Sequence, residues 1–429
     1  MGRRLLATFA VLFAALATAG SAAAADALTR ALSAGELTKA EYTLERAESL
    51  FRLRYVRARY GDVARPDPRE ATLVLRDLAA QLSELPADRR ARAAELLSRP
   101  AADARACGEA LCVHWAESSP NAPPGADGDP ATVPPWVTTT MTVFENVWAQ
   151  EIGRLGYRPP LSDVTSPVNG GDARLDVYLA DVGADGLYGY CASDDPGASA
   201  VGAAQKREVS AYCVVDDDFD PGQYPAATGE QALAVTAAHE FFHAVQFSYD
   251  WREDLWFMEG TASWVEDEVY DHVNENLGYL WKASVLRHPA VPVDYAGNGF
   301  QYGSWIFWRY LSERLGTGIV RDTWERVGGR DAYSLRAASP ALAAKGLTFG
   351  SVFADFAAAN RIPSRRYQEG GAYPTAPAAE TKTLSRGRPT TGWRYTSIRH
   401  LSSLYYSVRP GRTVSRRATL RVALDGPAR

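Results

Sequence analysis

Apolar residues at helical spacing mark the first part of the chain, residues 26–106. Two sets of them follow one another at steps of mostly three or four residues: Leu37, Ala40, Leu44, Ala47 and Phe51, then Leu75, Leu78, Leu82 and Leu85. Thr38 and Glu41 stand at the capping-box spacing that begins a helix. We therefore predict an N-terminal helical region, either a pro-segment or a helical module packed on the rest of the chain.

Strand and helix patterns are mixed in residues 107–376. Runs of β-branched and aromatic residues predict strands at Leu175–Leu179 and Val209–Val215. A helix is expected over Trp136–Leu155, and the segments 230–249 and 255–270 contain no proline and also favour helix. Strands combined with long helices are typical of an α+β domain.

The pattern changes again in residues 377–429. Tyr395–Val408 and Ala418–Leu424 carry β-branched and aromatic residues on either side of a Pro-Gly turn. We predict a small C-terminal β unit there. The expected fold class is therefore α+β, with a helical module before the central domain and a β-rich basic segment after it.

The first 25 residues have the pattern of a secretory signal peptide. Arg3 and Arg4 precede the apolar run Leu5–Ala19, and small residues lead to Ala25. A membrane anchor is the alternative, but about 15 apolar residues fall short of the roughly 20 that span a bilayer. Since no later segment is apolar enough to span a membrane, we expect a secreted, extracellular protein. We also expect a monomer.

Charge is distributed unevenly along the chain. Residues 115–380 carry 18 basic and 36 acidic side chains, whereas residues 381–429 carry 11 basic side chains and one acidic. Nucleic-acid binding needs clustered Lys and Arg, so the acidic middle argues against nucleic acid as a partner. The basic C-terminal segment could face the acidic middle or a cell surface.

Four cysteines lie in two local pairs, Cys107 with Cys112 and Cys191 with Cys213. An even number of cysteines in an exported protein predicts disulfides, and these pairings are the simplest of three. An alternative makes Cys107 a thiolate that caps a metal ion from a pro-segment.

A metal-binding motif lies in the segment 230–249, at His239-Glu240-Phe241-Phe242-His243. Histidines four residues apart project from one face of a helix, so both imidazoles can reach one zinc ion. Glu240 is turned slightly round the helix, where it can act on a water without binding the metal. The sequence therefore predicts one catalytic Zn²⁺ with His239 and His243 as ligands.

The third ligand is expected from the next helix. Glu259 lies 16 residues after His243, far enough for one helix to end and a second to return. Glu266 is about 10 Å further along that helix, so the two carboxylates cannot share one ion. We expect Glu266, Asp267 and Glu268 to form a solvated or supporting cluster. Calcium is conceivable at Asp127 and Asp129, but too few ligands are spaced for a calcium loop, and a plain turn is favoured.

His239-Glu240-x-x-His243 followed by Trp256-Phe257-Met258-Glu259-Gly260-Thr261-Ala262 resembles the gluzincins, and more narrowly a family of secreted bacterial zinc metalloproteases of that clan. The resemblance implies a zincin-like catalytic domain with ligands His239, His243 and Glu259 and with Glu240 as general base. No Gly-Ala-Met-Glu-Asn segment of the zinc aminopeptidases is present, which favours an endopeptidase acting on protein or peptide. Thermolysin-like enzymes orient a zinc histidine with an Asp four residues after the third ligand, where this chain has Ser263.

Tyr302 is the candidate donor to the oxyanion of the reaction, because gluzincins often use a tyrosine from such a position. The alternative is an ordinary core aromatic. An extended substrate could pair with the strand Ser210–Val215. Two other functions stay open: a secreted binding or surface module that zinc stabilises without proteolysis, and zinc-dependent hydrolysis of a non-peptide bond.

Overall fold

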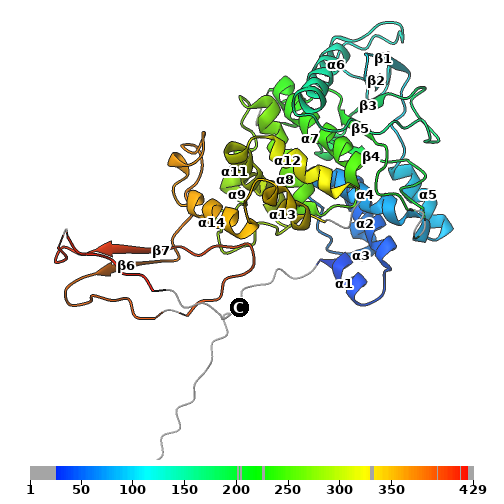
Figure 1. Cartoon of the computed structure of the whole chain (residues 1–429). Helices are drawn as coiled ribbons and strands as arrows, with labels where there is room; N and C mark the ends of the chain where they lie inside the picture. The colour runs from blue at the N-terminus through cyan, green and yellow to red at the C-terminus, as the bar shows by residue number, and fades with distance from the viewer. Residues whose placement is uncertain are drawn as a thin grey trace, which may run out of the picture.

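A five-stranded mixed sheet organises the middle of the chain (Figure 1). The structure is a computed structural model that describes residues 26–200, 202, 205–224, 228–328, 333–393, 395–415 and 417–423. The strands lie in the order β1-β2-β3-β5-β4, with bounds Ala104–Cys107, Leu111–Trp115, Leu175–Ala180, Tyr212–Asp216 and Gly189–Ala192 in that order. The predicted signal peptide, residues 1–25, lies outside the described residues.

The two edges of this sheet are antiparallel to its parallel centre. β2, β3 and β5 run parallel, whereas β1 and β4 pair antiparallel with their neighbours. All residues of β2, β3, β4 and β5 are buried, as expected of strands covered on both faces. The prediction that Ser210–Val215 offers an edge to substrate is wrong, because β5 lies between β3 and β4.

Two long helices form the centre of the molecule beside the sheet. α7 (Gly229–Asp250) begins with a capping box between Thr228 and Gln231, and α8 (Leu255–Tyr270) begins at Asp254, whose side chain accepts from the N–H of Phe257. α7 is buried on every side, as expected of a helix with apolar residues all around its axis. α7 and α6 (Pro135–Trp148) contact each other and the sheet, so both cover one face of it.

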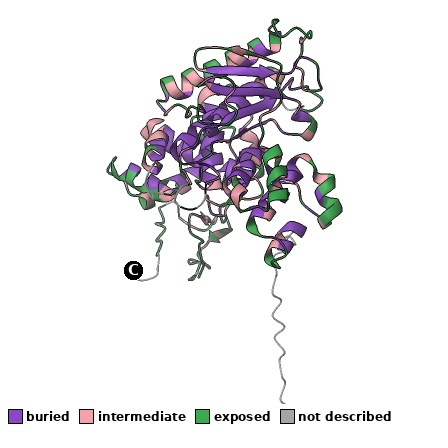
Figure 2. Ribbon diagram, turned by 90° about the vertical axis from the view of Figure 1, so that its right-hand side faces the viewer, coloured by how far each residue is buried: buried purple, intermediate pink, exposed green. Residues whose placement is uncertain are grey.

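The helices after α8 complete this core (Figure 2). They are α9 (Leu277–Lys282), α10 (Phe300–Gly303), α11 (Trp305–Leu315), α12 (Gly318–Val327), α13 (Leu335–Ala343) and α14 (Phe349–Asn360). α10 and α11 pack directly on α8, which requires a small residue at Gly260. A Cβ there would lie 2.3 Å from the Ser304 Oγ and 3.1 Å from the Trp308 Nε1. Gly260, the residue after Glu259, thus lets α10 and α11 pack closely against α8.

The N-terminal helices share the core of the sheet domain. They are α1 (Ala27–Ser33), α2 (Lys39–Phe51), α3 (Leu53–Tyr60), a 3₁₀ turn η1 (Pro68–Glu70), α4 (Ala71–Gln81) and α5 (Ala87–Leu96). The capping box of Thr38 and Glu41 is present at the start of α2. Apolar side chains of α2, α4 and α5 belong to the same buried cluster as those of the sheet, whereas α1 has a small cluster of its own. The proposed boundary at 106/107 falls inside β1, so β1 joins the two regions.

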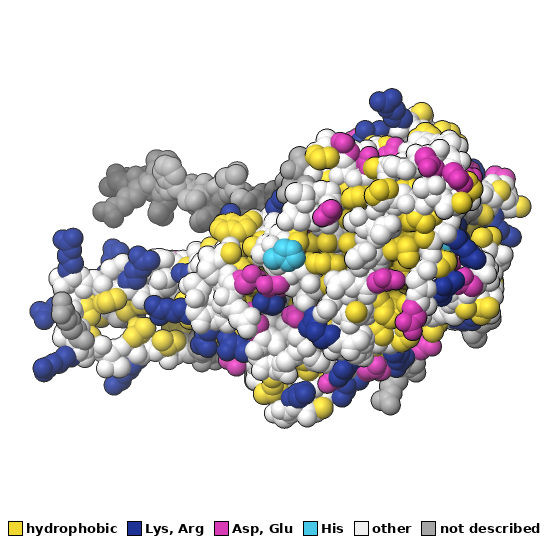
Figure 3. All heavy atoms as spheres, turned by 90° about the horizontal axis from the view of Figure 1, so that it is seen from above, with side chains coloured by type: hydrophobic (Ala, Val, Ile, Leu, Met, Phe, Trp, Pro, Cys, Tyr) yellow, Lys and Arg dark blue, Asp and Glu magenta, His cyan; other side chains and the backbone are white. Residues whose placement is uncertain are grey.

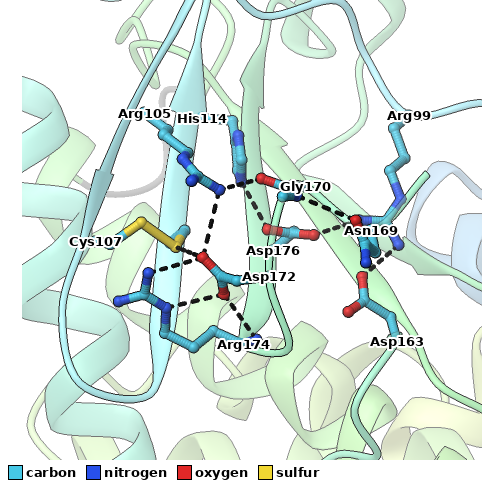
Figure 4. A network of polar contacts seen from close by, with 12 residues as sticks. Arg99, Arg105, Cys107, His114, Asp163, Asn169, Gly170, Asp172, Arg174 and Asp176 are labelled. Atoms are coloured by element: carbon cyan, nitrogen blue, oxygen red, sulfur yellow. Dashed lines mark hydrogen bonds and ion pairs between the residues drawn. A yellow bond between two sulfur atoms is a disulfide. The ribbon is translucent and has the colours of Figure 1, made fainter. Parts of the chain in front are cut away.

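A buried ion cluster fastens the end of this helical region to the sheet (Figure 4). The Arg99 guanidinium is 3% exposed and binds the carboxylates of Asp163 at 2.6 Å, Asp194 at 2.8 Å and Asp176. Asp176 lies on β3 and also accepts from His114 Nε2 at 2.7 Å. Because isolated buried charges are costly, this mutual neutralisation holds the segment after α5 against the sheet.

Both predicted disulfides are present. Cys107 pairs with Cys112 across the β1–β2 hairpin, and Cys191 on β4 pairs with Cys213 on β5. Each bond joins residues that face each other in the strand register. The structure therefore contradicts the alternative in which Cys107 is a free thiolate directed at a metal ion. No helix in the described part of the chain is long and apolar enough to cross a membrane.

A two-stranded arm projects from the body at the C-terminal end (Figure 1). It pairs β6 (Glu380–Leu384) with β7 (Tyr406–Pro410) in parallel, and Lys and Arg side chains gather on its surface (Figure 3). The predicted strand at Tyr395–Val408 is present only from Tyr406 onward, and none is assigned within residues 417–423. Helices, a mixed sheet and this small β unit confirm the α+β class.

Candidate metal centre

Helix α7 brings the two motif histidines together on one buried face. His239 is 7% exposed and His243 is fully buried. Their Nε2 atoms lie 3.1 Å apart, with the two rings nearly perpendicular. The four-residue spacing thus has the consequence expected on a helix, since residues one turn apart are neighbours on its surface.

Glu259 on α8 faces both imidazoles. Its Oε2 lies 3.1 Å from the His239 Nε2 and 3.7 Å from the His243 Nε2, and its side chain is fully buried. The three groups therefore converge on one point inside the protein. Among the described residues they form one of the groups whose ligand atoms lie close enough together to hold an ion.

Hydrogen bonds on the far side of each ring fix how the histidines are protonated. His239 Nδ1 lies 2.6 Å from the Glu266 carboxylate, which can only accept from it when ionised. His243 Nδ1 lies 2.8 Å from the Gln246 Oε1, and the Gln246 amide nitrogen donates to the Met258 carbonyl at 2.9 Å. The carbonyl cannot donate, so the Gln246 oxygen must face His243. In their neutral form both histidines therefore carry hydrogen on Nδ1 and a lone pair on Nε2.

A cation fits where the two Nε2 atoms and the Glu259 carboxylate meet. When both rings are neutral, their Nε2 lone pairs and the Glu259 carboxylate are all acceptors, and acceptors 3.1–3.7 Å apart repel one another unless a cation lies between them. Tetrahedral zinc with ligand bonds of about 2.0–2.1 Å separates its ligand atoms by about 3.4 Å. The observed separations bracket that value. The buried Glu259 Oε1 has no partner in the described part of the protein, so it too has acceptor capacity left for an ion.

The charges around the site favour a cation there. Burial lowers the pKa of His239, but the hydrogen bonds and charges of Glu259 and Glu266 raise it well above the ordinary value, so the site attracts positive charge, either a proton on the His239 Nε2 or a metal ion in its place. Burial and the nearby Glu259 carboxylate raise the pKa of Glu70 to about 7. Burial also raises the pKa of Glu151, to which His239 contributes an opposing attraction. The buried carboxyl groups of Glu70 and Glu151 thus have few cations near them, among the described residues, to neutralise their charge.

The Glu240 side chain contacts the N-terminal helical region. Its Oε2 accepts a hydrogen bond of 2.7 Å from the Thr72 hydroxyl on α4. Glu240 and His239 line one cavity of about 30 Å³, together with Arg69, Tyr188 and Tyr279 among others. That volume is comparable to the space of one water molecule in the liquid. The Glu240 carboxylate and the candidate metal ligand His239 thus share a space that can hold one water.

Tyr302 lies beside the site on α10. Its ring centroid is 6.3 Å from that of His239, and its ring stacks on Tyr279 at 5.1 Å. Its hydroxyl is buried without a partner among the described residues. Burial and the Glu259 carboxylate raise the pKa of this phenol well above 10, so it keeps its proton and stays a donor. This environment suits a donor to an oxyanion, and that role stays a prediction.

The sequence alone does not assign the contacts of three residues around the candidate ligands. Glu266 holds His239 in the way expected of the acid that Ser263 cannot provide. Gln246 holds His243 from one helical turn away, a spacing that could have indicated it. Thr72 carries no signal in the sequence. Asp127 and Asp129 each accept from a backbone N–H two residues on, as residues of a turn do.

Comparisons with known proteins add nothing to this description. No family model matches the chain, and no curated protein matches it. The case for a metal centre therefore depends on the donor set and its geometry. Its strongest element is the buried cluster in which the Nε2 atoms of His239 and His243 and the Glu259 carboxylate converge.

Replacing Glu266 with alanine is expected to weaken zinc binding by about 10- to 100-fold, because the carboxylate that orients His239 and raises its basicity is lost. Competition with a chromogenic chelator measures the affinity. Glu268→Ala is the matched control, since Glu268 lies on the same helix but contacts Arg309. Equal affinities in Glu266→Ala and the wild type would show that Glu266 does not support the metal centre.

Proposed function

We propose that the chain is a secreted zinc-dependent metalloendopeptidase of the gluzincin type. The observation that carries this proposal is the buried cluster of two imidazole Nε2 atoms and one carboxylate, with Glu240 next to it and outside it. A structural zinc site usually has four protein ligands, whereas a catalytic site keeps one position open. Two disulfides fit an oxidising compartment outside the cell.

Each residue has a distinct part in the proposed reaction. His239, His243 and Glu259 hold the ion, and zinc supplies Lewis-acid chemistry that makes water more acidic and polarises a carbonyl group. Glu240 takes a proton from the attacking water and passes it to the leaving amine nitrogen. The Tyr302 hydroxyl donates a hydrogen bond to the oxygen on which negative charge develops.

Substrate cannot reach the site by adding a strand to the sheet. β5 has no free edge, and the outward N–H of Cys191 on β4 donates to the Thr72 hydroxyl at 2.8 Å. The cavity beside Glu240 has room for a water molecule. Arg69, Tyr188 and Tyr279 line this cavity and would contact a substrate bound there. We expect basic peptides to be favoured, because the surrounding domain is strongly acidic.

A second candidate function is a secreted surface module that zinc stabilises but that cleaves nothing. The same ligand set would serve it. Glu240 weighs against this candidate, because a carboxylate that lines the cavity without binding the ion has no use in a purely structural site. Hydrolysis of a non-peptide bond would use the same residues.

Metal analysis combined with a cleavage assay tests these functions. Purified chain is expected to bind one zinc per molecule and to cleave casein or peptides of a quenched-fluorescent library. Chelation should abolish cleavage and zinc should restore it. His243→Ala should lose both the metal and the activity, whereas His272→Ala, an exposed histidine, should keep both. Zinc binding without any cleavage would favour the surface module, and absence of zinc would exclude both metal functions.

A further inference from the structure

Thr72 connects the N-terminal helical region to the candidate general base. It is the second residue of α4, it is fully buried, and it lies 168 residues from Glu240 in the sequence. Its hydroxyl makes two hydrogen bonds, one with the Glu240 Oε2 at 2.7 Å and one with the backbone nitrogen of Cys191 at 2.8 Å.

The direction of both bonds is fixed by chemistry. The Cys191 N–H can only donate, so the hydroxyl oxygen accepts there. The single hydroxyl hydrogen is then free for the Glu240 carboxylate, which accepts it. This arrangement occupies Oε2 and leaves Oε1 of Glu240 without a hydrogen bond from the described residues. One oxygen of the carboxylate is held, and the other is available to the reacting water.

Both supports of the Thr72 hydroxyl are rigid. Cys191 lies on β4, which is paired with β5 and cross-linked to it through Cys213. α4 is packed into the main core by Leu75 and Leu78, both fully buried. Thr72 itself has a branched Cβ with few accessible rotamers. The hydroxyl therefore has one position, set by the sheet on one side and by the N-terminal helices on the other.

Neighbours of Thr72 fix the start of α4 in the same way. The Arg69 guanidinium lies between the rings of Tyr188 and Tyr279, at 5.2 and 4.9 Å, and pairs with Glu275 at 2.6 Å. Such a cation between two aromatic rings is held by electrostatic attraction to both faces. Arg69 thus lines the same cavity as Glu240, three residues before Thr72.

We propose that Thr72 is the positioning residue of the general base Glu240, and that the N-terminal helical region is a permanent part of the working enzyme and not a pro-segment. This inference rests on the proposed peptidase function. A carboxylate displaced by about 1 Å transfers protons poorly, so loss of the Thr72 hydroxyl lowers turnover far more than it lowers substrate binding.

The test compares Thr72→Val and Thr72→Ser in the full, zinc-loaded chain, with the best-cleaved peptide of the fluorescent library as substrate. We expect Thr72→Val to lower kcat about 10- to 100-fold with KM nearly unchanged, and Thr72→Ser to restore kcat. Thr43→Val is the matched control, because Thr43 is a buried threonine of α2 that bonds only to the Ala40 carbonyl. Hydrogen exchange of the Cys191 amide should accelerate in Thr72→Val alone.

Each outcome of this test supports or overturns the positioning role of Thr72. If wild-type protein is active and Thr72→Val has the same kcat, Thr72 does not position Glu240. A rise in activity in Thr72→Val would also overturn the inference and would identify the region as inhibitory. If Thr72→Val fails to bind zinc or to fold, Thr72→Ala against Thr72→Ser isolates the same hydroxyl. A wild-type chain that binds zinc and cleaves nothing overturns the proposed function itself, and this inference with it.

Discussion

Replacing Glu240 with glutamine is expected to reduce peptide hydrolysis by about 10²- to 10⁴-fold while one zinc ion stays bound per chain. The amide cannot accept a proton from water at neutral pH, so the chemical step is lost. Its carbonyl oxygen can still accept the Thr72 hydroxyl, so the local packing is kept. None of the three ligand side chains changes. Metal content by mass spectrometry and turnover of the library peptide measure the two quantities on one sample.

Glu230→Gln is the control for this substitution, because Glu230 is exposed in the first turn of the same helix. It should leave both quantities at the wild-type level. Equal activity in Glu240→Gln and wild type would exclude Glu240 as the base and leave the cleavage without a chemical explanation. A simultaneous loss of zinc would mean that Glu240 supports the ion and not the water.

Replacing Arg99 with methionine is expected to destabilise the fold by about 3–5 kcal/mol, because it leaves buried carboxylates without their cation. Asp163 and Asp176 are each 2% exposed and lose their shared partner. Burial already raises the pKa of Asp163 to about 6 in the presence of Arg99, above its value of about 3.9 in the unfolded chain. A raised folded pKa means that stability present at low pH is lost as the pH rises through it. Arg99 lowers the pKa of Asp163, so the pKa rises further in Arg99→Met and the loss of stability continues to higher pH than in the wild type. The difference in unfolding free energy between the wild type and Arg99→Met should therefore be larger at pH 8 than at pH 5.

Urea unfolding with both disulfides intact measures this effect. Arg105→Met is the control from the same region (Figure 4), since its pair with Asp172 is 3.4 Å long and its side chain is 40% exposed. Exposed pairs of this kind contribute about 1 kcal/mol or less. Similar losses in Arg99→Met and Arg105→Met, or a deficit independent of pH, would contradict the view that Arg99 neutralises a buried acidic cluster.

The parts of the fold that depend on neighbouring residues could be predicted from the sequence. The capping box at Thr38 and the helix of His239 and His243 depend on spacings of three or four residues, which local backbone geometry determines. Both disulfides also join segments near each other in the chain. The convergence of Glu259 on the histidines followed from the length of the turn between two helices.

Features that depend on distant segments could not be predicted. The edge strand Gly189–Ala192 has only four residues, and nothing in its composition shows that it pairs outside Tyr212–Asp216. The contact of Thr72 with Glu240 depends on how the N-terminal helices pack on the sheet. The sequence indicates a supporting acidic cluster at Glu266, Asp267 and Glu268. Which of the three contacts His239 depends on the rotation of α8, and in the structure it is Glu266.

The distances along the chain between members of the site suggest an order of assembly. His239 and Glu259 are 20 residues apart on two consecutive helices, so closing that loop costs little chain entropy. The contact from Thr72 to Glu240 closes 168 residues and needs the sheet and the N-terminal helices to be packed first. Under the proposed function, a nascent helical hairpin would capture zinc early, whereas Glu240 would be oriented as the base only when the whole molecule has folded. Metal uptake and catalytic competence would then be separate events in the maturation of the protein.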